Sequence, residues 1–282
     1  MSKNSKRNAA MAVGIATLLG AGALGGTLAY LTDNENTTNT FTVGKVKIDG
    51  TEPDYPGNDS DDVKDLVPNE EVVKNPQMVN TGINDAIAFI KVTVPVENVT
   101  LVADDGTKSA KAAQEIFWLK DAEDAISTHA NHFDADWIEL TDEEGFYSAS
   151  GDKVSAYTAP GTRTYIFGYN KKIEGSSTTD GSAQTAANKK TTPLFDKVQL
   201  KNVLEGELTE GAARNIVIDF YAIQAEEVLE NSIDLTDTLN KANLTKIYDI
   251  FVKQNDGLGR KESPQNHSTV DADTNGADLK GN

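Results

Sequence analysis

The clearest pattern along the chain is an alternation of apolar and polar side chains with a period of two. In residues 86–96 this alternation places six aliphatic side chains on one face: Ala86, Ala88, Ile90, Val92, Val94 and Val96. Residues 216–224 (IVIDFYAIQ) repeat the pattern, so both segments are expected to form core β-strands. Shorter runs bounded by Gly, Asp, Ser or Pro predict further strands at 40–49, around 72–73 and 78–79, and at 137–140, 145–148 and 164–169.

Two segments have helical spacing instead. Residues 108–118 (KSAKAAQEIFW) predict a short helix, and residues 236–252 predict an amphipathic helix. The stretch 174–192 has almost no large apolar side chains and predicts a flexible insertion, while residues 254–282 predict a disordered polar tail. Short strands without βαβ alternation therefore indicate a mainly β domain over 30–253, an antiparallel β-sandwich with a few helical insertions.

The N-terminus has the pattern of an export signal. Three cations, Lys3, Lys6 and Arg7, precede an apolar run over 9–24, and small residues then lead to Ala29. This order is typical of a secretory signal peptide, so we expect residues 1–29 to be removed and the remainder to act outside the cytoplasm. Without cleavage, the apolar run would remain as an N-terminal membrane anchor.

Charge and composition narrow the possible functions. The chain has 26 Lys and Arg against 44 Asp and Glu, a formal charge of −18. Such a surface repels phosphate backbones, so nucleic acid is not an expected partner. The absence of cysteine excludes disulfides, thiolate catalysis and Cys-ligated metal sites.

Three segments carry a family resemblance. They are Gly25–Asp49 (GGTLAYLTDNENTTNTFTVGKVKID), Val67–Gly82 (VPNEEVVKNPQMVNTG) and Ile216–Ala225 (IVIDFYAIQA). In this order they resemble TasA-type biofilm matrix proteins and camelysin-like proteins of Gram-positive bacteria, with Asn69 where that family usually has glycine. The resemblance implies a jelly-roll-like sandwich, processing by a SipW-type signal peptidase, and a place in the extracellular matrix or on the cell surface among other matrix or surface components.

The resemblance also implies a way of assembling. In TasA-type fibres the N-terminal strand of one subunit completes the sheet of its neighbour, which makes residues 31–46 the candidate donor strand. Phe41, Val43 and Val46 would be its anchoring side chains. Strand addition satisfies backbone groups at a sheet edge while apolar side chains fill a groove. The same alternation also fits ordinary pairing within the domain, and both readings stay open.

Camelysin-like relatives are described as metalloproteases, which directs attention to the histidines. His129 and His132, followed by Asp134 and Asp136, form an H-x-x-H spacing without the glutamate of H-E-x-x-H, and His267 stands alone in the tail. A zinc protease uses two helical histidines, a further ligand and a glutamate base. The alternatives are a catalytic zinc site, adventitious metal binding, or a solvated polar loop.

Calcium has two weak candidate sites. Asp271, Asp273 and Asn275, followed by Gly276, match the opening of a calcium loop, but Asn282 replaces the glutamate of the twelfth position. A cluster of aspartates in 54–65 offers weak calcium binding or is simply a solvated charge run.

We therefore expect a secreted structural protein without enzymatic activity or cofactor, whose copies associate with one another. Calcium or zinc binding is the weaker alternative. A camelysin-like secreted metalloprotease and a monomeric surface binding module are the competing functions.

Overall fold

The computed structural model describes residues 46–122, 129–140, 145–176, 188–225, 239–255 and 268–269. The expected signal peptide, residues 177–187 of the expected insertion and most of the expected tail lie outside these ranges. Within them, no helix is both long and apolar enough to cross a membrane.

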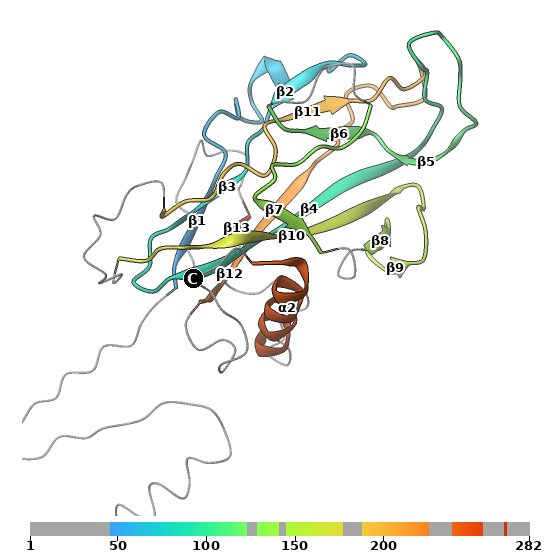
Figure 1. Cartoon of the computed structure of the whole chain (residues 1–282). Helices are drawn as coiled ribbons and strands as arrows, with labels where there is room; N and C mark the ends of the chain where they lie inside the picture. The colour runs from blue at the N-terminus through green and yellow to red at the C-terminus, as the bar shows by residue number, and fades with distance from the viewer. Residues whose placement is uncertain are drawn as a thin grey trace, which may run out of the picture. The chain divides into compact units, whose positions relative to one another are not determined.

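A large antiparallel sheet forms the centre of the fold (Figure 1). Its longest strand, β4 (Ala86–Val99), lies between β12 (Val217–Gln224) and β10 (Gly161–Ile173). The remaining strands extend this trio: β5 (Ala112–Glu115) beside β4, β7 (Trp137–Glu139) and β8 (Gly145–Ser148) beside β10, β9 (Lys153–Val154) beside β8, and β13 (Ser268–Thr269) beside β12.

A second layer covers one face of this sheet. It contains two small antiparallel groups, β2 (Glu71–Val73), β11 (Lys197–Leu200) and β6 (Phe117–Lys120) in one, and β1 (Ile48–Thr51) and β3 (Gln77–Asn80) in the other. The segment before β11 links them, because Thr191 N donates to Met78 O at 2.9 Å and Leu194 N donates to Pro76 O at 2.9 Å. A 3₁₀ turn, η2 (Asp61–Val63), lies in the acidic loop between β1 and β2.

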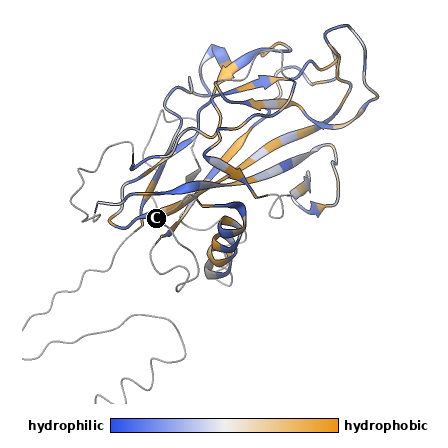
Figure 2. Ribbon diagram, viewed as in Figure 1, coloured by the Kyte–Doolittle hydropathy of each residue, from blue (hydrophilic) through white to orange (hydrophobic). Residues whose placement is uncertain are grey.

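Because successive side chains of a strand point to opposite faces, the large sheet has one hydrophobic core on each face. From β4, Ala88, Ile90 and Val92 point between the two sheets, whereas Ile87 and Phe89 point to the opposite face. There they pack against α2 (Lys241–Asn255), which lies across the large sheet in Figure 1. Figure 2 shows polar residues among the apolar ones along these strands, because α2 covers only part of this face and Lys91 on the same face stays partly exposed.

The expectation of a mainly β, antiparallel protein is confirmed, but the helix predicted over 108–118 is wrong. That region forms β5 and β6, with Glu115 opposite Val96 of β4 and Phe117 opposite Leu200 of β11. Ile116 between them is fully buried, so tertiary pairing overrides the helix propensity of the alanines and lysines. The second predicted helix is present as α2 and begins later, with the Asn240 side chain accepting a hydrogen bond from Asn243 N at 3.0 Å.

Candidate functional site

The candidate site is the start of β1, where the predicted donor segment joins the folded domain. Val46, the first described residue, is half-buried against the core between the sheets. The carbonyl of the next residue, Lys47, accepts hydrogen bonds from Thr81 N at 2.9 Å and Gly82 N at 3.0 Å. The backbone is thus held by a turn immediately after the segment that the sequence singled out.

Asn80 organises that turn from the inside. Its side-chain amide donates to Asn84 O at 2.8 Å and to Ile173 O at 3.0 Å, and its Oδ1 accepts from Gly82 N at 2.9 Å. Asn80 is only 3% exposed. One buried asparagine therefore ties the turn to the end of β10 by donating to two carbonyls, and it gives Gly82 N a second acceptor beside Lys47 O.

The chain after β1 is held in the same way. Lys74 Nζ contacts the two carboxylate oxygens of Glu52 at 2.8 and 2.9 Å, and both side chains are buried. Next to this pair, Asn75 Oδ1 accepts from Asp54 N at 3.1 Å and Asn75 Nδ2 donates to Asp54 Oδ2 at 2.7 Å. The Lys74–Glu52 ion pair and the two hydrogen bonds between Asn75 and Asp54 thus fix the chain that follows β1.

The segment Val67–Gly82, one of the three that carry the resemblance, therefore acts as a clamp on both ends of β1. We use the name β1 clamp for Lys74, Asn75, Asn80, Thr81 and Gly82. The same segment contains Asn69, whose φ of 67° lies in the left-handed region that glycine and asparagine adopt most readily. That backbone angle explains why asparagine fits where the related proteins usually have glycine.

β1 lies directly against β12. A Cβ atom on Gly50 would lie 2.2 Å from Phe220 Cδ2, so no larger residue fits there while the ring stays in place. Phe220 is fully buried between the sheets. On its outer side β12 pairs with β13, with Asp219 opposite Thr269 and Phe220 opposite Ser268. The edge beside β1 thus accepts an added strand from a distant part of the chain.

The two candidate zinc ligands point to different carboxylates. His129 Nε2 lies 3.7 Å from Asp104 Oδ1, and His132 Nδ1 lies 2.8 Å from Asp121 Oδ2. Both histidines are exposed. Across the described part of the chain, no three His, Asp or Glu side chains are placed to hold a metal ion.

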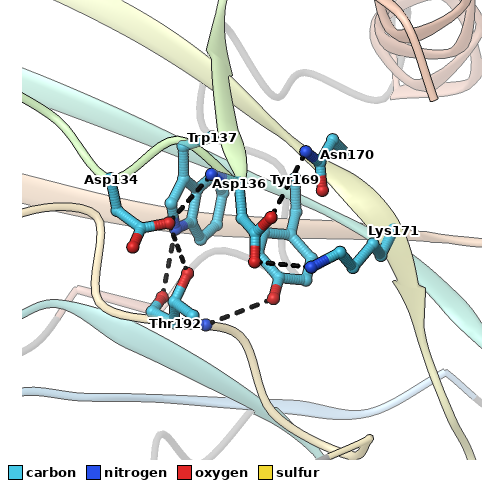
Figure 3. A network of polar contacts seen from close by, with 7 residues as sticks. All are labelled: Asp134, Asp136, Trp137, Tyr169, Asn170, Lys171 and Thr192. Carbon is cyan, nitrogen blue, oxygen red and sulfur yellow. Dashed lines mark hydrogen bonds and ion pairs between the residues drawn. The ribbon is translucent and has the colours of Figure 1, made fainter. Parts of the chain in front are cut away.

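Asp134 and Asp136 join neither histidine and instead belong to the polar network of Figure 3. Asp134 Oδ1 accepts from Thr192 Oγ1 at 2.8 Å and from Asp136 N at 2.9 Å, and Asp136 Oδ2 accepts from Lys171 Nζ at 2.6 Å. Trp137 Nε1 donates to Thr192 O at 3.0 Å. The network fastens the loop before β7 to β10 and to the chain that leads into β11, which is a structural role.

The other candidates are only partly within the described residues. Phe41, Val43, Asp271, Asp273 and Asn275 all lie outside them. In the acidic loop, Asp54 contacts Asn75 and Asp61 Oδ1 lies 3.8 Å from Lys64 Nζ.

A buried polar cluster was not foreseen from the sequence. Glu115 Oε1 accepts hydrogen bonds from Tyr157 Oη and Tyr165 Oη, and burial followed by the Glu115 charge raises the pKa of Tyr165. Nearby, Lys201 Nζ lies 3.5 Å from the centre of the Trp118 ring, and burial lowers the pKa of Lys201 to about 8. Among these residues Tyr165 lies in the strand predicted over 164–169, but the contacts themselves were not predicted, since the partners come from remote segments.

Comparison with known proteins supports the family resemblance. Residues 4–139 match the camelysin metallo-endopeptidase family model. No curated protein and no solved structure matches the chain. The matched region contains the β1 clamp and both candidate zinc ligands, whereas β10, β12 and α2 lie beyond it.

Proposed function

Starting from its match to the camelysin family, we propose that this chain is a secreted structural protein of the extracellular matrix or cell surface. Its signal peptide is removed by a SipW-type peptidase. Its copies then join by strand exchange, in which the candidate donor segment of one copy adds to the outer edge of the large sheet of the next. Of residues 31–46, Val46 packs against the core of its own domain, so residues 31–45 form the added strand. The observation that carries this proposal is the pairing of β13 with β12, because an edge that takes one added strand can take another.

The β1 clamp supports the exchange by fixing the point where the donor segment leaves the domain. Buried polar contacts hold Lys47 and the chain after β1, and Gly50 packs on Phe220 of β12. The described chain therefore begins, at Val46, just before a strand that lies beside the acceptor edge. Residues before Val46 can pair with another copy while β1 itself keeps its place.

The donor segment has suitable side chains for this role. Phe41 and Val43 share one face in the pattern TFTV. Burying each of them contributes roughly 1.5–3 kcal/mol, and each backbone hydrogen bond to the edge adds about 1 kcal/mol. A short strand with two apolar anchors is thus sufficient for a stable contact between copies that are present at high local concentration.

Electron microscopy of residues 30–282 tests this proposal. We expect filaments from the unaltered protein, and none after deletion of residues 30–45 or in the double variant Phe41→Ala and Val43→Ala. Thr42→Ala is the matched control, because the alternation in TFTV assigns its side chain to the opposite face from Phe41 and Val43, and this variant should still form filaments. A protein that stays monomeric at all concentrations and salt conditions would refute the proposal.

Because the matched family is described as camelysin metallo-endopeptidase, peptidase activity is the second candidate function. Casein cleavage that a chelator stops, and that His129→Ala and His132→Ala each abolish, would replace the structural proposal. We expect no such cleavage, since each histidine faces its own aspartate.

A further inference from the structure

The C-terminal part of the chain supplies the strand at the outer edge of the large sheet. β13 consists of Ser268 and Thr269 and pairs antiparallel with Phe220 and Asp219 of β12. On its other side, β12 pairs with β4 along its whole length, Val217–Gln224. The two ladders on β12 therefore differ greatly in length.

β12 is held by its core contacts and by β4. Phe220 and Ile218 pack between the sheets, and Tyr221 and Ile223 pack under α2. All four are buried. Removal of β13 would thus leave the strand in place with its edge accessible.

The residue types of β13 make it a weak occupant. A serine and a threonine bring little apolar surface, and a two-residue ladder offers few backbone hydrogen bonds. The proposed donor segment brings Phe41 and Val43 instead. The tail has one advantage, which is that attachment to the same chain gives it a high effective concentration at the edge.

The first and the last of the described strands, β1 and β13, lie together at this edge. β1, which follows the donor segment directly, lies against β12 and β13. A donor strand from another copy and the resident β13 would therefore compete for the same backbone groups of β12.

From this geometry we propose that β13 is a plug, an internal strand that occupies the acceptor edge of β12 until the donor strand of another copy displaces it. This inference rests on the proposed strand exchange. The plug raises the protein concentration at which copies begin to join. It thereby delays assembly until the secreted protein has accumulated outside the cell.

The test compares three forms of residues 30–282: the unaltered protein, the double variant Ser268→Pro and Thr269→Pro, and the control Ala277→Pro and Leu279→Pro. Proline removes the backbone N–H and cannot maintain a strand ladder. The plug variant should polymerise at a protein concentration about tenfold lower, as expected for the loss of one or two hydrogen bonds. The control should polymerise at the original concentration. A second variant that ends at residue 255 should behave like the plug variant.

Hydrogen exchange in dilute, monomeric protein gives an independent readout. The amide of Asp219 or Phe220 that points away from β4 should exchange faster in the plug variant than in the control. Equal exchange, or filaments from all forms at one concentration, would overturn the plug and leave strand exchange intact. An absence of filaments from every form would overturn strand exchange, and the plug with it.

Discussion

Replacing Asn80 with alanine should loosen the β1 clamp at its most buried point. The asparagine side chain makes three hydrogen bonds to backbone groups, at 2.8, 2.9 and 3.0 Å. Alanine removes the partner of two carbonyls, at 1–3 kcal/mol or about 2 kcal/mol for each buried unsatisfied group, whereas Gly82 N keeps its bond to Lys47 O at 3.0 Å. Because Asn84 is partly exposed, water can replace the bond to its carbonyl, so we expect a loss of about 2 kcal/mol in the free energy of unfolding.

Urea unfolding of residues 30–282, followed by tryptophan fluorescence, measures this loss. With a slope of about 3 kcal/mol per molar urea for a domain of this size, the midpoint should fall by about 0.7 M. Asn188→Ala is the matched control, since this exposed asparagine makes one bond of 3.2 Å to Glu174, and its midpoint should move by less than about 0.2 M. A shift for Asn80→Ala no larger than the control's would show that the asparagine does not hold the turn.

Three further substitutions follow from the described contacts. Lys74→Met should cost about 3–5 kcal/mol in urea unfolding, because it leaves Glu52 buried without its cation, and adding Glu52→Leu should recover most of the loss. Leu244 is fully buried under the large sheet, so Leu244→Ala should lower the free energy of unfolding by about 2–5 kcal/mol, measured by thermal melting. An unchanged melting temperature would mean that α2 is not docked on the sheet. Lys201 has a pKa of about 8 when folded and 10.5 ordinarily, so the folded chain binds fewer protons than the unfolded chain between these values. Stability from this group should rise with pH through that window, and urea unfolding at pH 7.5–9.5 should show a smaller rise for Lys201→Met.

The period of two made the main strands predictable. In β4, Lys91 and Thr93 alternate with Ile90, Val92 and Val94, which identified the face that packs between the sheets. The alternation did not predict which element covers the second face of the sheet, where Ile87 and Phe89 pack against α2. Helical spacing indicated that this helix exists but gave no information about where it docks, because docking depends on the complementary shape of two distant surfaces.

The candidate site was predictable only in part. The family segment Val67–Gly82 marked the important residues, yet the partners of Lys74 and Asn75 lie 22 and 21 positions away along the chain. Such partners are set by the pairing of β1 with β3, which no local pattern encodes. The wrong prediction of a helix at 108–118 has the same cause, because pairing with the distant strands β4 and β11 decides the conformation of this segment.

Cysteine cross-linking tests the central claim of strand exchange most directly, because the chain has no cysteine of its own. One form would carry a single cysteine at each position of 39–45 in turn, and the other would carry Val217→Cys at the half-exposed start of β12. Oxidation of mixed filaments should link the two forms at alternate donor positions, as expected for a strand with a period of two. Filaments that yield no cross-link between the two forms at any of these positions would contradict the account.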